Sequence, residues 1–338
     1  METNLFDFFL PPELIAQRPV TPRDTCRMMV LNRKKKTWEH RQFFEIEEYL
    51  SPGDILVVNE SKVVKARFFA QKVTGGRVEI FFVRFFKGWW ECLLHPSSRV
   101  RTGQELRLLI NPEYRWVVRE RLGETWLLEP LFESNEVFFD QFGEVPLPPY
   151  IREKGIDLEA YQTVYAREWG SVAAPTAGLH FTPELLEKLK GKGIAVVSVV
   201  LHVGLGTFRP VKVKQIEEHT MHKEWFRIGN EEAKRILEAR ERGGKVVAVG
   251  TTVVRVLETV WQKLGTLGEY EGETDLFIYP GFCFQVTDAL VTNFHLPRST
   301  LFMLVCAFGG TDFVKKAYEE AIQRQYRFYS FGDAMFLY

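Results

Sequence analysis

The feature that most constrains the fold is a change in the pattern of expected secondary structure along the chain. Residues 62–130 consist of short runs rich in β-branched and aromatic side chains, separated by turn signals such as Gly75-Gly76 and Lys87-Gly88. Residues 155–338 instead alternate strand-like and helix-like stretches. Many short consecutive strands predict an antiparallel barrel or sandwich, and strands alternating with helices predict an α/β layer. We therefore expect an α/β large domain plus a small antiparallel β-barrel domain.

The domain boundaries follow from the same patterns. We expect residues 1–60 to be the first part of the α/β domain, 61–149 the β-barrel domain and 150–338 the main part of the α/β domain. The expected barrel strands are 63–73, 77–86, 89–94, 105–110, 115–121 and 125–129. In the α/β part we expect a hairpin over 27–43, strands over 55–58, 194–203 and 245–249, and helices over 182–191, 231–242, 300–307 and 314–324. Thr251-Thr252 is expected to cap the helix that follows it.

Composition and charge limit the class of protein. The four cysteines (Cys26, Cys92, Cys283, Cys306) form no CxxC pair, which argues against a zinc ribbon or a disulfide framework and fits a reducing cytosol. The acidic N-terminus lacks the pattern of a signal peptide, and the apolar run Leu301–Phe308 is too short to span a bilayer. We expect a cytoplasmic protein with no membrane partner, acting as a monomer.

Any contact with nucleic acid must be local, because the formal net charge is zero. The segment 61–121 carries 13 Lys/Arg against 5 Asp/Glu, a local excess of 8 positive charges. A solvated sheet surface explains this excess as well as an RNA-binding surface does.

Two polar clusters lie at the ends of expected elements, one before a helix and one after a buried strand. Ala174–Thr182 carries Thr176 and His180 into a helix N-terminus, where free amides favour anionic groups. Leu201–Pro210 places His202 at the end of a buried strand, before a Gly-x-Gly loop that a ligand can approach closely. Read alone, the first is also consistent with a simple turn and a satisfied histidine, and the second is a weak pattern.

Two further clusters lie in the second half of the chain. Gly250–Arg255 combines a strand, hydroxyls and a helix start, although Arg255 and Glu258 are spaced for a plain intrahelical ion pair. Thr292–Thr300 places His295 and Arg298 in a loop between a strand and a helix, where functional residues concentrate. His219 and His222 have an HxxH spacing, but no further ligand motif accompanies them, and no metal is expected.

Taken together, these segments resemble one family nearly end to end. They include Phe6–Pro19, Pro146–Ile151, Val172–Thr182, Leu201–Pro210, His219–Trp225, Asp288–Leu301 and Tyr326–Met335. The chain is similar in them to the S-adenosylmethionine:tRNA ribosyltransferase-isomerases of queuosine biosynthesis. One departure is Asn59-Glu-Ser-Lys-Val63, where the family usually has Asn-Asp-Thr-Arg-Val. Lysine in place of arginine loses a planar fork, so a bidentate phosphate contact there is in doubt.

The resemblance implies a reaction. The ribosyl part of the co-substrate S-adenosylmethionine is transferred to 7-aminomethyl-7-deazaguanine at the wobble position of a tRNA with a GUN anticodon. Isomerisation gives epoxyqueuosine-tRNA, and adenine and methionine leave. The fold it implies, an α/β domain beside a small β-barrel, agrees with the patterns above.

The candidate site residues fall into three groups. For acid–base catalysis they are His180, His202, His295 and Glu224. For binding of S-adenosylmethionine they are Thr176, Arg209, Thr251, Thr252 and Arg255. For RNA they are Lys34, Lys35, Lys62 and Arg67, with Trp89 or Trp90 as a stacking surface.

Two other functions compete with this interpretation. An RNA methyltransferase would release S-adenosylhomocysteine rather than adenine and methionine, so product chromatography separates the two. A non-catalytic RNA-binding module would leave the polar loops of the α/β part without a purpose and would not bind the co-substrate.

Overall fold

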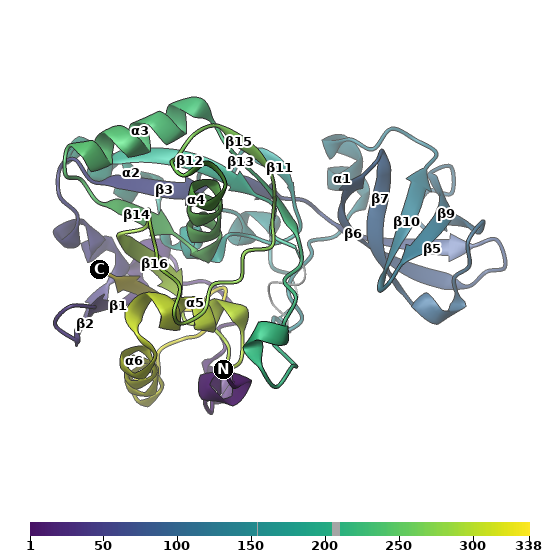
Figure 1. The fold of residues 1–338 in the computed structure, drawn as a ribbon. Helices are drawn as coiled ribbons and strands as arrows, with labels where there is room; N and C mark the ends of the chain where they lie inside the picture. The colour runs from purple at the N-terminus through teal and green to yellow at the C-terminus, as the bar shows by residue number, and fades with distance from the viewer. Residues whose placement is uncertain (154, 205–209) are drawn as a thin grey trace. The chain divides into compact units, whose positions relative to one another are not determined.

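The computed structural model describes residues 1–153, 155–204 and 210–338, which divide into two compact units (Figure 1). Unit 1 comprises Met1–Ser61, Pro149–Glu168 and Ala174–Tyr338, and unit 2 comprises Lys62–Pro148 and Trp169–Ala173. The short segment Trp169–Ala173 thus belongs to the barrel unit, although the unit 1 segment Pro149–Glu168 precedes it in sequence. Each unit is described by itself below.

Unit 1 is built on a nine-stranded mixed sheet in the order β15-β13-β12-β3-β14-β16-β17-β1-β2. Its central strands β12, β3, β14 and β16 are all parallel, so their carboxyl ends meet at one edge. The strands are β1 (Arg27–Asn32), β2 (Thr37–Gln42), β3 (Ile55–Asn59), β12 (Ala195–Leu201), β13 (Glu224–Ile228), β14 (Val246–Val249), β15 (Tyr270–Thr274), β16 (Ala289–Asn293) and β17 (Ala334–Leu337). β4 (Ser61–Val63) and β11 (Glu168–Ser171) pair separately.

Helices cover both faces of this sheet. Alternate residues of β3, Leu56 and Val58, belong to a buried apolar cluster with α2 residues Leu185 and Leu189. Because successive strand side chains point to opposite faces, Asn59 belongs to the other face, which α4 covers. The helices of this unit are α2 (Pro183–Gly191), α3 (Asn230–Glu241), α4 (Thr251–Leu264), α5 (Thr300–Gly309) and α6 (Thr311–Gln323) (Figure 1).

Short 3-10 helices complete the covering of unit 1. They are η1 (Thr3–Phe6), η2 (Pro12–Leu14), η3 (Arg23–Thr25), η4 (Phe43–Tyr49), η6 (Leu158–Tyr161), η7 (Thr176–His180) and η9 (Ile216–Glu218). One of them, η7, carries the first polar cluster, and its buried Ala177 packs in the same apolar cluster as α2. Because η7 packs against this apolar cluster, the loop that precedes α2 is held in position.

Unit 2 is a closed antiparallel barrel in the order β10-β7-β6-β5-β8-β9. The strands are β5 (Arg67–Lys72), β6 (Arg77–Phe86), β7 (Trp89–His95), β8 (Glu105–Leu108), β9 (Arg115–Leu122) and β10 (Thr125–Pro130), with η5 (Ser97–Arg99) between β7 and β8. The nine-stranded sheet with helices and the closed barrel confirm the predicted α/β domain plus β-barrel domain.

Two buried side chains of the barrel core, Phe138 and Phe139, come from an element that the sequence analysis missed, α1 (Glu136–Phe142). Asn135 caps it by accepting from the Phe138 amide at 3.1 Å. Phe138 stacks on Phe68 of β5, and Phe139 packs 4.8 Å from the ring of Trp90 in β7. This short helix therefore fills the barrel with aromatic rings.

Trp90 is wholly buried and donates from Nε1 to Ser134 Oγ at 3.0 Å, so it is unavailable as a stacking surface for RNA. Its neighbour Trp89 is only half-buried, and in this respect it remains a candidate. The alternation of the strand thus assigns different roles to two adjacent tryptophans.

Replacing the two tryptophans provides a matched test of the barrel core. We expect Trp90→Ala to lower the free energy of unfolding by about 3–5 kcal/mol, because it empties a buried site among aromatic rings. Trp89→Ala, the control, should cost much less. Urea unfolding of the full chain, followed by circular dichroism, measures both; equal losses would contradict this packing.

Candidate functional site

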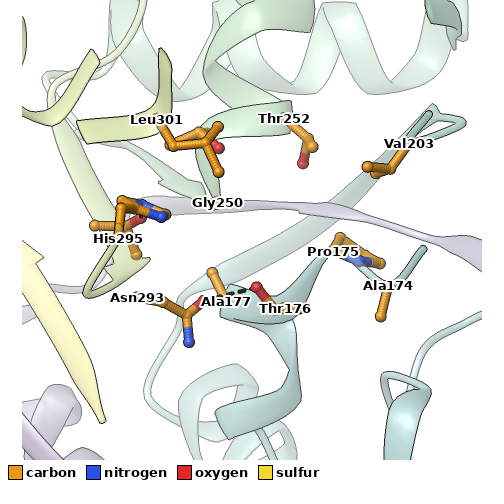
Figure 2. A pocket seen from close by; sticks show the side chains of 12 residues that line it. Ala174, Pro175, Thr176, Ala177, Val203, Gly250, Thr252, Asn293, His295 and Leu301 are labelled. Carbon is orange, nitrogen blue, oxygen red and sulfur yellow. Dashed lines mark hydrogen bonds between the residues drawn. The ribbon is translucent and has the colours of Figure 1, made fainter. Parts of the chain in front are cut away.

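A pocket lies at the carboxyl edge of the parallel strands. Ligands of α/β proteins bind preferentially at this edge. Figure 2 shows its lining side chains, which come from the start of η7, the start of α4, the end of β16 and the start of α5. The lining residues are Ala174, Pro175, Thr176, Ala177, Val203, Gly250, Thr251, Thr252, Thr292, Asn293, His295 and Leu301.

One wall of the pocket is the N-terminus of α4. Thr251 and Thr252 are the first two residues of the helix and do not cap it; the N-cap is Gly250. Gly250 has φ +95°, a conformation that side chains other than glycine's rarely adopt, and it offers no capping side chain. The first-turn amides of α4 therefore face the pocket without a side-chain cap, and the helix dipole favours a negative group there.

The buried side chain of Asn59 connects this wall to the neighbouring strands. It donates to the Leu201 carbonyl and accepts from the Leu201 amide, both at 3.0 Å. Its Nδ2 also lies 3.5 Å from Thr252 Oγ1. The amide of Asn59 therefore continues the pairing of β3 with β12 beyond the last strand residue and holds Thr252 at the pocket.

The opposite wall is organised by Asn293, the last residue of β16. Its Oδ1 lies 2.9 Å from Thr176 Oγ1, its Nδ2 lies 3.0 Å from His180 Nε2, and the same Nδ2 lies 3.2 Å from the Tyr329 carbonyl oxygen. His180 Nδ1 in turn lies 3.2 Å from Cys26 Sγ. His180 is only 4% exposed and does not line the pocket; Asn293 lies between the two.

Of the four candidate catalytic residues, His295 is the one that lines the pocket. Its Nε2 lies 2.8 Å from Thr292 Oγ1, and its backbone amide donates to Tyr318 at 3.0 Å. Burial lowers the pKa of His295 to about 3. The imidazole is consequently neutral near pH 7.

Burial also lowers the pKa values of the other two histidines. The pKa of His180 falls to about 3, mainly because of burial and further through Arg327 and Arg23. The pKa of His202 falls to about 4 through burial and Arg227. The ring of His202 packs 4.8 Å from that of Trp225, and the next residue, Val203, lines the pocket. All three histidines are therefore neutral near pH 7.

Glu224 and Arg255 form a buried ion pair with each other, and each is 3% exposed. Arg255 also donates to the carbonyls of Leu276 and Thr274, at 3.0 Å and 3.3 Å. Glu224 Oε1 accepts from the Gly204 amide at 2.8 Å. These bonds hold the Arg255 guanidinium inside the protein. Neither Arg255 nor Glu224 lines the pocket.

The predicted intrahelical pair of Arg255 with Glu258 is wrong. Glu258 instead accepts from the backbone amides of Gln285, Val286 and Thr287 and from the Thr287 hydroxyl, at 2.8–3.1 Å. The partner of Arg255 comes from β13, an element that the sequence analysis did not predict. Arg209, a candidate for co-substrate binding, lies outside the described residues.

The candidate RNA-binding residues lie on both units. Lys34 and Lys35 are exposed in the β1–β2 turn, where their backbone amides donate to Asn32 Oδ1. In unit 2, Lys62 pairs with Glu136, and Arg67 pairs with Glu79 at 3.2 Å. Exposed pairs of this kind contribute at most about 1 kcal/mol, so a phosphate can compete for these cations.

Residues 1–153, 155–204 and 210–338 contain no group of three or more His, Cys, Asp or Glu side chains placed to hold a metal ion. They also contain no helix that is both long and apolar enough to cross a membrane.

The fold and the pocket define a class, an α/β protein with a polar ligand site at the ends of its parallel strands and a barrel as its second unit. Comparison with known families narrows this class. Residues 3–337 match the family described as queuosine biosynthesis protein.

Individual relatives agree over the whole chain. The chain is 56% identical to the S-adenosylmethionine:tRNA ribosyltransferase-isomerase of Thermotoga maritima and 51% identical to that of Thermosipho africanus, and each match covers 100% of both chains. A crystal structure of the S-adenosylmethionine tRNA ribosyltransferase from Thermotoga maritima matches with a TM-score of 0.59 and 45% identity, covering 99% of this chain and 100% of that one.

The chain belongs to the S-adenosylmethionine:tRNA ribosyltransferase-isomerase family of queuosine biosynthesis. This confirms the resemblance found from its sequence motifs. It is an enzyme of tRNA modification, and both S-adenosylmethionine and tRNA follow as its substrates from the name that these relatives share.

The two most buried histidines predict a dependence of stability on pH. Their folded pKa values of about 3 lie below the unfolded value of about 6.5, so the unfolded state binds more protons between these values. The stabilisation is complete above about pH 6.5 and is lost as the pH falls toward 3. Each histidine contributes up to about 1.4 kcal/mol per pH unit to this slope.

Urea unfolding at steps between pH 7.5 and 4.5 measures this slope. We expect His180→Gln/His295→Gln to flatten it relative to the wild type, with the exposed His222→Gln as the matched surface substitution. A free energy of unfolding that does not change with pH below 6.5 in the wild type would contradict neutral burial of these rings.

Proposed function

We propose that this enzyme transfers and isomerises the ribosyl group of S-adenosylmethionine onto 7-aminomethyl-7-deazaguanine at the wobble position of a GUN-anticodon tRNA. The products are epoxyqueuosine-tRNA, adenine and methionine. The observation that carries this proposal is the full-length identity of 56% to a relative with this type of activity. We further propose that the enzyme acts as a monomer in the cytoplasm.

The pocket at the strand ends is the proposed binding site for S-adenosylmethionine. The uncapped start of α4, with Thr251 and Thr252, suits the methionine carboxylate because helix N-termini favour anions. Thr176 on the opposite wall contacts the same ligand. Arg255 supports α4 and the loop that carries Leu276 through its buried bonds and is removed from the direct contacts.

His295 is the proposed general base. The sulfonium acidifies the hydrogens on the adjacent ribose C5′, and His295 is the candidate imidazole that lines the pocket where one of them would be removed. The departing adenine needs a proton, which the protonated His295 can return. His202, whose next residue lines the pocket, is the second candidate, whereas Glu224 is occupied by Arg255.

Product analysis tests the reaction and the base together. Incubation with S-adenosylmethionine and tRNA bearing the aminomethyl-deazaguanine should give epoxyqueuosine by nucleoside mass spectrometry, with adenine and methionine in equal amounts. We expect His295→Ala to lower kcat about 10²- to 10⁴-fold, because a positioned base contributes that much. His222→Ala, at an exposed position outside the pocket, is the control.

Release of S-adenosylhomocysteine would instead indicate a methyltransferase. Turnover of His295→Ala within a few-fold of the wild type would remove His295 from the proton transfer while leaving the reaction itself in place.

Lys34, Lys35, Lys62 and Arg67 are the proposed phosphate contacts for the tRNA. Each cation that neutralises a phosphate releases a counterion, so it adds about 0.7–0.9 to the slope of log affinity against log salt. We expect Lys34→Gln/Lys35→Gln to weaken tRNA binding and to reduce this slope by between about 1 and 2, measured by fluorescence anisotropy at several salt concentrations.

The matched control removes the same charge elsewhere, in Lys234→Gln/Lys263→Gln, whose side chains are exposed on α3 and α4. Affinity and salt slope that change equally in both double variants would show that only the overall charge matters, and would contradict the assignment of Lys34 and Lys35.

A further inference from the structure

The hydrogen bonds around Asn293 determine where its amide nitrogen lies. The Tyr329 carbonyl oxygen can only accept, so the end of Asn293 that faces it at 3.2 Å must be the NH₂ group. The same nitrogen lies 3.0 Å from His180 Nε2, and this ring nitrogen must therefore be the unprotonated acceptor. The neutral ring then carries its proton on Nδ1, directed at Cys26 Sγ.

The ring of His180 is held in this state from all sides. Both of its nitrogens are engaged, and its ring packs 5.1 Å from that of Phe43. The nearby charges are Arg23 and Arg327, which disfavour a second proton. His180 has no lone pair left for a substrate, and Asn293 separates it from the pocket.

The other end of Asn293 determines the polarity of the Thr176 hydroxyl. Asn293 Oδ1 can only accept, so Thr176 Oγ1 must donate its single proton to it across 2.9 Å (Figure 2). The Thr176 oxygen then has only lone pairs to offer a ligand. Thr176 is half-buried and lines the pocket, so these lone pairs are the polar feature of that wall.

We propose that Cys26, His180 and Asn293 form a relay that holds Thr176 Oγ1 as a hydrogen-bond acceptor for a ribose hydroxyl of S-adenosylmethionine. This inference rests on the proposed function and assigns a specificity-determining contact within it. His180 is in this assignment a positioning residue, and Thr176 does not bind the methionine carboxylate, which would set acceptor against acceptor.

A ribose hydroxyl fits this acceptor better than the ammonium group of the co-substrate does. The residues that line the pocket within the described ranges include no Asp or Glu, so an ammonium group there would be buried without a counter-charge. His295, the proposed base for the ribose C5′, is bonded to Thr292, the neighbour of Asn293 in β16. Thr176 and His295 line the same pocket, so we assign the donor beside Thr176 to a hydroxyl of the ribose whose C5′ faces His295.

Calorimetry with the full-length protein and three probes tests the contact: S-adenosylmethionine and its 2′-deoxy and 3′-deoxy analogues. We expect Thr176→Val to weaken the binding of S-adenosylmethionine about tenfold, because the ribose hydroxyl is then buried without a hydrogen-bond acceptor. For one of the two analogues the same substitution should cause no further loss. Thr176→Ser should restore most of the affinity, and Thr37→Val, exposed on β2, is the matched control.

Equal affinity of Thr176→Val and wild type for S-adenosylmethionine overturns the contact, and so does an equal loss for all three probes. Failure of the wild type to bind S-adenosylmethionine at all would overturn the proposed function itself, which keeps the two conclusions distinguishable.

Turnover of His180 variants tests the positioning role. A glutamine side chain offers a carbonyl oxygen that can accept from Asn293 in place of Nε2, so His180→Gln should recover much of the kcat that His180→Ala loses. A base at this position would instead leave both variants about 10²- to 10⁴-fold impaired, since neither side chain takes up a proton, and this outcome overturns the relay.

Discussion

Two buried asparagine amides, Asn59 and Asn293, hold the carboxyl edge of the parallel strands together. Where parallel strands end, their last peptide groups lose their ladder partners, and a buried unpaired group is costly. A primary amide carries both a donor and an acceptor, so it can replace a peptide group at this place. Asn59 does so for Leu201 of β12, and Asn293 does so for the Tyr329 carbonyl. The pocket exists because these two side chains keep its walls in place.

The same constraint explains why the histidines of the site are neutral. A buried imidazolium would need a counter-charge, and the partners of His180 and His295 are an amide, a thiol and a hydroxyl. The buried charges of Glu224 and Arg255 form a pair in which each ion is the counter-charge of the other, and both also bond to backbone groups.

The α/β domain, the β-barrel domain and the four polar loops could be predicted from the sequence, because they depend on local periodicity and turn residues. The fold class is confirmed, and Thr176, Thr251, Thr252 and His295 meet at one pocket. The partners of the charged residues were not predictable in this way. Arg255 has a carboxylate three residues away on its own helix, yet it pairs with Glu224 of β13, 31 positions earlier. Long-range packing decides such a choice, and one sequence contains no local signal of it.

The partners of the His180 ring were beyond local reasoning for the same reason. Its motif was consistent both with a catalytic histidine at a helix start and with a satisfied histidine in a turn. Only the tertiary contacts of η7 with Asn293 and Cys26 show where both ring nitrogens point.

Because of these contacts, the two walls of the pocket differ in hydrogen-bonding character. The α4 wall presents backbone donors and favours an anion, whereas the Thr176 wall presents an acceptor whose proton is already committed to Asn293. A ligand with a carboxylate at one end and hydroxyls on its sugar satisfies both walls in one orientation. Reversed, it would place acceptor against acceptor at Thr176. In the proposed binding mode, the polarity of Asn293 therefore selects the orientation in which the sugar lies beside the neutral imidazole of His295.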